Sequence, residues 1–467
     1  MSSSRPPRMG VAQLTVLTVI NMMGSGIIML PTQLAQVGTV SITSWIVTVA
    51  GSLVLAYVFS RCGRFSRKGG GMGGYAEYSF GKPGNFLTNY TYGVSLVIAN
   101  IAIATSIVGY MAAFFQMSLS PLQVGIGTIG ILWAATVLNF GGPRMTGHLG
   151  SIAIWGIVLP VIGISVAGWF WFNPAIYMAA WNPHELPILQ AISASISVTL
   201  WAFLGLESAC ANADSVENPE RNVPIAVMVG TLITAVIYIA STNVIAGIVP
   251  NMQLMKSNAP FGLVFAHIFN PTVGRIIIAM MVVSCFGSLL GWQFTVGQVF
   301  KSSADEGYFI KLFGLVTAKT NTPVIGMVAI TTVQTALSLL TISPSLQKQF
   351  NILLNLAVVT NLAPYILSMS AAEELMRSTS LPKKTVTTTA AIAFIGNLYS
   401  FYALYSAGQE AVYWGGMVVL FGFLLYGKTA CKFGLPQPTV VTSGERQADR
   451  LITDLAAKTA ALVQEKS

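Results

Sequence analysis

Long apolar runs separated by short polar connections make up most of the chain. Runs of roughly 18 or more apolar residues are long enough to cross a lipid bilayer as helices. The pattern predicts about twelve such spans, an even number, so both ends of the chain should face the same side. The spans lie at about residues 11–37, 40–62, 85–116, 121–140, 148–172, 190–213, 224–249, 273–300, 323–341, 348–370, 386–407 and 411–430. We therefore expect an all-α polytopic membrane protein.

Composition supports the same class. The chain has 54% hydrophobic and 8% charged residues, whereas a soluble domain carries about 25% charged residues. The formal net charge of +9 follows membrane topology, because the positive residues gather in alternate connections. One set of connections holds Arg5, Arg8, Arg61, Arg64, Arg67, Lys68, Lys82, Arg144, Arg221, Lys301, Lys311, Lys319, Arg377, Lys383, Lys384, Lys428 and Lys432. The other set holds little more than Lys256, Arg275 and Lys348. Positive loops stay in the cytoplasm, so both termini are expected there and no nucleic acid partner is expected.

The ends of the chain are predicted to lie outside the membrane domain. We expect a cytoplasmic segment 1–10, a twelve-helix domain 11–430 and a cytoplasmic tail 431–467. The tail alternates acidic and basic residues and repeats apolar residues at helical spacing, which favours a short amphipathic or partly disordered helix. The first apolar run is too long for the core of a signal peptide, so we interpret it as a retained span.

The sequence predicts no cofactor, metal site or enzyme chemistry. Its four cysteines have neither disulfide-framework nor zinc spacing. The three histidines His148, His184 and His267 lie near predicted loops, and no nucleophile and base share a plausible depth. Rings of charge, which an ion channel would need, are also missing from the sequence.

Two predicted spans contain helix-breaking residues near their centres. The first contains Gly24, Ser25 and Gly26, and the sixth contains Gly205 beside Glu207. Irregular backbone at membrane depth survives only where it lines a cavity or is buried in protein. Because the interruptions are five spans apart, they indicate an inverted repeat of two five-helix halves with a substrate between them. The alternative is that the glycines form a small-residue packing face for a neighbouring helix.

Glu207 is the one acidic residue deep in a predicted span. Such residues usually face the bundle interior and mark a path for a substrate or a proton, although a structural carboxylic acid is the alternative. No basic residue lies deep in any span, so a cationic substrate, a proton, or both in turn would be the partner. Trp201 and Trp292 offer aromatic faces for an ammonium group, with core packing as the alternative for Trp292. Tyr92 and Asn100 are weaker candidates of the same kind.

A glycine-rich segment, SRKGGGMGGYAEYSFGKPGN, precedes the third span. Gly69, Gly71 and Gly74 match G-x-G-x-x-G formally, but neither a strand nor a βαβ unit surrounds them, so nucleotide binding is not expected. We interpret the segment as a flexible cytoplasmic hinge, with Tyr75 and Glu77 near an inner gate.

Four segments resemble the basic amino acid/polyamine antiporter family of the amino acid–polyamine–organocation superfamily. They are NMMGSGIIMLP, GGMGGYAEYSFG, LWAFLGLESACANADSVENPERNVPIA and GSLLGWQFTVGQVFKSSADEGYF, within a resemblance that covers about residues 9 to 430. The resemblance implies a bacterial inner-membrane exchanger of an amino acid for its decarboxylation product, with putrescine and ornithine as the expected pair. Lysine with cadaverine, arginine with agmatine, and proton-coupled uptake stay open as alternatives. A homodimer also stays open.

The resemblance further implies roles for individual residues. Asn21, Ser25 and Gly26 would bind the substrate carboxylate at the break in the first span. The cationic end would meet Trp201 and Glu207 beside Gly205, with Trp292, Asn100 and Tyr92 contributing to the site. Tyr75, Glu77 and Glu207 would take part in gating or proton transfer.

Overall fold

The computed structural model describes residues 10–68, 71–207, 216–317, 320, 322–379 and 381–430. The predicted tail and all but the last residue of the predicted N-terminal segment lie outside them. The regular elements of the described part are helices. They are α1 (Val11–Gly26), α2 (Leu30–Ala35), η1 (Thr39–Ser41), α3 (Ile42–Phe65), α4 (Met72–Phe115), α5 (Pro121–Asn139), α6 (Pro143–Ala153), α7 (Trp155–Ala167), η2 (Gly168–Trp171), α8 (Pro174–Ala179), α9 (Ile188–Trp201), α11 (Pro219–Ile248), α12 (Asn251–Met255), α13 (Pro260–Ile268), α14 (Pro271–Asp305), η4 (Lys311–Gly314), α15 (Val324–Leu340), α16 (Leu346–Arg377), α17 (Lys383–Ser406) and α18 (Gln409–Ala430).

The all-α polytopic class is confirmed. Eight helical segments of the described part are long and apolar enough to cross a membrane, and three shorter apolar helices accompany them. On α17, which belongs to neither group, Phe394, Ile395, Leu398 and Phe401 are each more than half exposed. An outward-facing apolar surface of this kind suits lipid rather than water. The count of twelve spans and the inverted repeat stay predictions.

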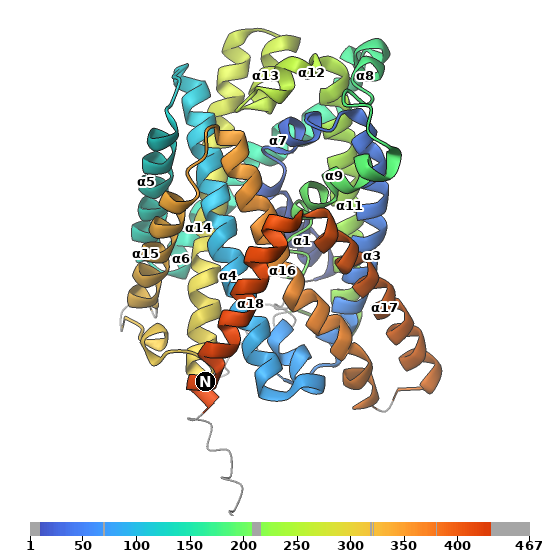
Figure 1. The fold of residues 1–467 in the computed structure, drawn as a ribbon, viewed down its shortest axis with the longest axis vertical. Helices are drawn as coiled ribbons and strands as arrows, with labels where there is room; N and C mark the ends of the chain where they lie inside the picture. Colours follow the sequence, from blue (N-terminus) through green and yellow to red (C-terminus); the bar gives the residue numbers. More distant parts are fainter. Residues whose placement is uncertain are drawn as a thin grey trace, which may run out of the picture.

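Long helices form the centre of the molecule. Figure 1 shows α4, α14 and α16 running side by side, with the short helices α8, α12 and α13 gathered at one end. A buried amide group ties this centre together. Gln293 Nε2 on α14 donates to Thr136 Oγ1 on α5 and Thr331 Oγ1 on α15, each at 3.1 Å, and to Gln334 Oε1 at 2.8 Å. Four helices meet at this group, because Asn100 Nδ2 on α4 also donates to Gln293 Oε1 at 2.8 Å.

The first predicted interruption is present as a break between α1 and α2. Helix α1 ends at Gly26, and α2 begins at Leu30. A break leaves backbone carbonyls without helical partners, which is costly at membrane depth. Two buried phenols supply donors: Tyr238 Oη bonds the Met22 carbonyl at 2.7 Å, and Tyr110 Oη bonds the Ile28 carbonyl at 2.9 Å. Two neighbouring helices, α11 and α4, therefore support the break.

The second predicted interruption follows α9, which ends at Trp201. Residues 202–207 form turns, and Gly205 has a φ of 108°, a value that residues with a side chain rarely adopt. The two breaks face each other. A Cβ on Gly26 would lie 3.4 Å from Ala202 Cα, and one on Gly205 would lie 3.4 Å from the Asn21 carbonyl oxygen.

The glycine-rich segment, which we expected to be a flexible hinge, is helical over most of its described part, and its flexibility stays a prediction. Helix α4 begins at Met72 and includes Tyr75 and Glu77, with non-helical backbone at Gly81, where φ is 61°. Packing overrides the low helix propensity of glycine here. At Gly73, a Cβ would meet the Asn89 side chain at 2.3 Å, so the missing side chain allows one turn of the helix to approach another part of the chain.

Helices α3 and α17 offer a test of this packing through two glycines at one interface. A Cβ on Gly51 would lie 2.4 Å from the Tyr399 ring, whereas a Cβ on Gly396 would lie 3.4 Å from Leu55. We expect Gly51→Ala to destabilise the protein, because overpacking costs about 1–3 kcal/mol. Gly396→Ala should be nearly neutral. Thermal unfolding in detergent, followed by size-exclusion chromatography, measures both, and equal midpoints for the two variants would contradict the packing described here.

Candidate functional site

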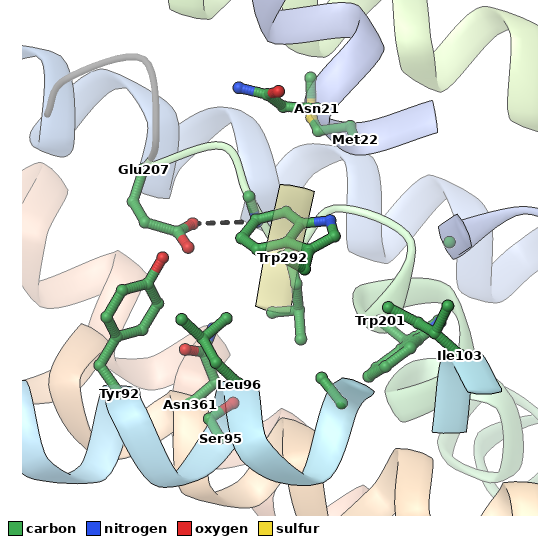
Figure 2. Close-up of a pocket in the computed structure, with 14 residues that line it drawn as sticks. Asn21, Met22, Tyr92, Ser95, Leu96, Ile103, Trp201, Glu207, Trp292 and Asn361 are labelled. Atoms are coloured by element: carbon green, nitrogen blue, oxygen red, sulfur yellow. Dashed lines mark hydrogen bonds between the residues drawn. The ribbon is translucent and has the colours of Figure 1, made fainter. Parts of the chain in front are cut away.

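A cavity lies where the two helix breaks face each other. It is lined by Asn21, Met22, Gly26, Tyr92, Ser95, Leu96, Ala99, Ile103, Trp201, Leu204, Gly205, Glu207, Trp292 and Asn361 (Figure 2). Its volume is about 40 Å³, and a cavity needs about 10–15 Å³ on the same measure to hold one water molecule. A ligand larger than a few waters therefore requires the lining side chains to move.

Glu207 supplies the carboxylate of this cavity and is only 6% exposed. Its Oε2 accepts hydrogen bonds from Tyr365 Oη on α16 at 2.6 Å and from the Gly205 amide at 3.1 Å. The hydroxyl of Tyr92 on α4 also points toward it (Figure 2). No Lys, Arg or His is among the described residues that line the cavity. Because a buried carboxylate without a cationic partner is costly, the cavity is suited to a positively charged ligand or a proton.

Two tryptophans form aromatic walls of the cavity. Trp292 comes from α14, and a Cβ on Gly205 would lie 3.3 Å from its ring, so the glycine allows the chain to pass close to the indole. Trp201, the last residue of α9, packs edge-on against Phe350, with the ring centroids 6.3 Å apart. Indole faces attract ammonium groups by about 0.5–2 kcal/mol each. The walls therefore complement the carboxylate without adding charge.

The broken helix α1 contributes the opposite kind of group. Asn21 and Gly26 line the cavity beside the break. Backbone amides released at a helix break can bind an anionic group such as a carboxylate. Ser25 belongs to α1, but its side chain lies outside the described part of the structure. The cavity thus combines a carboxylate beside one break with Asn21 and Gly26 beside the other.

Three predicted site residues do not line the cavity. Asn100 lies in the amide group around Gln293. Tyr75 is buried near the start of α4. Glu77 pairs with Lys68 at 3.0 Å and accepts a hydrogen bond from Asn85 Nδ2 at 2.7 Å. The structure therefore separates these three from the seven predicted residues that it brings together.

The cluster around Glu77 reaches the segment that follows α14. Tyr308 Oη donates to Glu77 Oε2 at 3.5 Å. Burial, together with the carboxylates Glu77 and Glu306, raises the pKa of Tyr308 to about 12. The phenol therefore keeps its proton at neutral pH and remains a hydrogen-bond donor to Glu77. This contact joins the first turns of α4 to the end of α14.

Sequence reasoning missed Ser95, Asn361 and Tyr365. Asn361 and Tyr365 are four residues apart on α16, so they share one helix face. Both are polar residues in a predicted span, which was the only available signal. Their proximity to Glu207 depends on how α16 packs against the break after α9.

A helical membrane protein with a carboxylate cavity between two broken helices has the architecture of a secondary transporter. The family model of amino acid permeases matches residues 9–427, so the chain belongs to the amino acid permease family. The putrescine transporter PotE of Haemophilus influenzae is 62% identical over 433 residues, covering 93% of this chain and 99% of the relative. PotE of Escherichia coli is 61% identical over 435 residues, with the same coverage. The cadaverine/lysine antiporter of E. coli is 34% identical over 376 residues, covering 79% of this chain and 83% of the relative.

Gly205 provides a test of the cavity geometry. Gly205→Ala places a side chain at a φ of 108° and against the Trp292 ring, so we expect transport efficiency to fall roughly tenfold or more. Gly291→Ala, one residue from Trp292, is the matched control because a Cβ there meets nothing within 4 Å. Uptake into proteoliposomes at equal protein density measures both. Equal uptake by the two variants would show that the close approach at Gly205 does not matter.

Proposed function

We propose that this protein is an inner-membrane antiporter that exchanges putrescine for ornithine by alternating access. The observation that carries the proposal is the buried Glu207 carboxylate, which lies between the helix breaks beside Trp201 and Trp292. The names of the relatives that are 61–62% identical support putrescine as the diamine. The distribution of positive loops supports a cytoplasmic location for both termini.

The cavity offers complementary groups for both substrates. An ammonium group would lie against the Glu207 carboxylate and the indole walls. The carboxylate of ornithine would meet the backbone beside Asn21 and Gly26 at the other break. Putrescine lacks that carboxylate, so it would depend more strongly on Glu207. The same site would therefore hold the two substrates in turn, as one-for-one exchange requires.

Exchange of these substrates moves charge. Putrescine carries two positive charges and ornithine carries one net positive charge, so export of the diamine moves one charge outward. An inside-negative potential opposes this step by about 2.3 kcal/mol per 100 mV. Decarboxylation inside the cell would supply the drive, because it consumes ornithine and produces putrescine.

The second candidate is exchange of lysine for cadaverine, which the name of the 34% identical relative favours. Proton-coupled uptake of putrescine through Glu207 is a further mode of the same site. The diamine candidates differ in the number of methylene groups that the cavity must accommodate. Exchange and symport differ in the gradient that drives transport.

A counterflow experiment tests the proposal. Ornithine trapped inside proteoliposomes should accelerate entry of labelled putrescine, because the site returns loaded rather than empty. Trapped lysine and arginine, and labelled cadaverine and agmatine, serve as the comparison panel. Stimulation by a pH gradient alone, with no effect of trapped ornithine, would replace exchange by proton symport.

Glu207→Gln should abolish putrescine transport while leaving the folded protein intact. The amide keeps the shape of the side chain but removes the negative charge that faces the ammonium group. Glu373→Gln is the matched control, since Glu373 pairs with Arg377 on the exposed end of α16. Labelled putrescine uptake and the elution profile of the purified protein are measured for both. Near-normal putrescine affinity in Glu207→Gln would sink the role assigned to this carboxylate.

A further inference from the structure

Asn361 is a cavity-lining residue whose side-chain oxygen has no partner. It lies on α16 and is 2% exposed. Its Oδ1 is buried without a hydrogen bond in the described part of the structure. A buried acceptor left unpaired usually costs about 1–3 kcal/mol, so native structures rarely keep one without a reason. Since the residue lines the cavity, a ligand that donates hydrogen bonds would supply the missing partner.

The neighbouring side chains orient the Asn361 amide. Tyr365, one helical turn further along α16, donates a hydrogen bond from its hydroxyl group to Glu207. The hydroxyl oxygen of Tyr365 must therefore act as the acceptor in the contact between Tyr365 and Asn361. The NH₂ group of Asn361 is then the donor. Asn361 therefore donates a hydrogen bond to Tyr365, and Tyr365 donates one to Glu207. This leaves Oδ1 as the free end of the amide, on the same helix face as the phenol that holds the carboxylate.

We propose that Asn361 Oδ1 accepts a hydrogen bond from the same substrate ammonium group whose charge Glu207 neutralises, and that it thereby selects primary amines. The inference rests on the proposed function, because it assumes that a protonated amine occupies this cavity. A primary ammonium has three N–H donors. The Glu207 carboxylate, in the turns after α9, and the Asn361 carbonyl, on α16, take two of them, which leaves one for a further acceptor or water.

Methylation of the amine removes donors without removing charge, so it separates the two contacts. Putrescine, 1,4-bis(methylamino)butane and 1,4-bis(dimethylamino)butane carry three, two and one N–H donors at each end. Both ends are modified alike, so neither molecule can reverse itself to present a primary amine. A site built to accept a hydrogen bond rejects analogues that lack the donor, and a bond to a charged donor is worth about tenfold or more in affinity.

The experiment measures the affinity of the purified protein for the three amines by intrinsic tryptophan fluorescence, to which Trp201 and Trp292 of the cavity contribute. Wild-type protein should prefer putrescine over the fully methylated amine by about tenfold or more. Asn361→Leu and Asn361→Ala should reduce this preference to roughly twofold, because both remove the acceptor. Asn361→Asp should retain the preference. Asn355→Leu is the matched control, since Asn355 lies on α16 but bonds Ser197 and does not line the cavity.

Tyr365→Phe separates direct contact from positioning. This variant breaks the path from Asn361 to Glu207 but keeps Oδ1, so it should weaken all three amines alike and preserve their ratio. A ratio in Asn361→Leu and Asn361→Ala equal to that of wild-type protein would overturn the inference and leave Asn361 a purely structural role. If wild-type protein binds none of the three amines, the proposed function fails instead. The two failures are therefore distinguishable.

Discussion

Burial of the Glu207 carboxylate, with no cationic side chain among the described cavity residues, is the constraint on which the site depends. Removing a carboxylate from water without compensation costs several kcal/mol. The structure provides partial compensation through the Tyr365 hydroxyl and the Gly205 amide. These are neutral donors, so the negative charge is stabilised but not cancelled. A cavity of this kind has a built-in preference for cations that no exposed acidic patch could match.

The broken helices are what allow such a carboxylate to face a cavity. A continuous helix would direct its amides along its own axis, whereas the turn at Gly205 turns one amide toward Glu207. The break in span 1 is stabilised by Tyr110 and Tyr238, whose hydroxyls satisfy carbonyls that the helix has released. The backbone at this break therefore receives hydrogen bonds from two neighbouring helices.

The sequence predicted the residues whose chemistry is unusual for their depth. Glu207, Trp201 and Trp292 stand out in apolar runs, and all three line the cavity. Asn100 was a weaker candidate and lies elsewhere, because the sequence did not predict which face of its helix meets the cavity. The side of α4 that faces the cavity repeats at helical spacing and consists of Tyr92, Ser95, Leu96, Ala99 and Ile103. Asn100 follows Ala99 directly, so its side chain points to a different side of the helix. Helix α4 is buried on nearly all sides, so its apolar pattern carries little information about which face meets the site.

Other differences between the sequence-based predictions and the structure arise from contacts between segments that are distant in the sequence. The approach of Asn361 to the break after α9 depends on packing that no local pattern encodes. The glycine-rich sequence at the start of α4 suggested a hinge, yet the segment is helical. The Asn89 side chain occupies the space that a Cβ on Gly73 would fill. Local propensity is a weak guide where close packing rewards the absence of a Cβ.

The amide group around Gln293 also bears on how this protein can evolve. One side chain serves partners on α4, α5 and α15, so replacing it alone would take away the partner of Asn100 Nδ2 and of Gln334 Oε1 at once. An apolar substitute becomes acceptable only if Asn100 and Gln334 change with it. Neutral drift at these positions is therefore blocked one step at a time. Lineages that diverge in substrate should carry this group either intact or replaced as a whole.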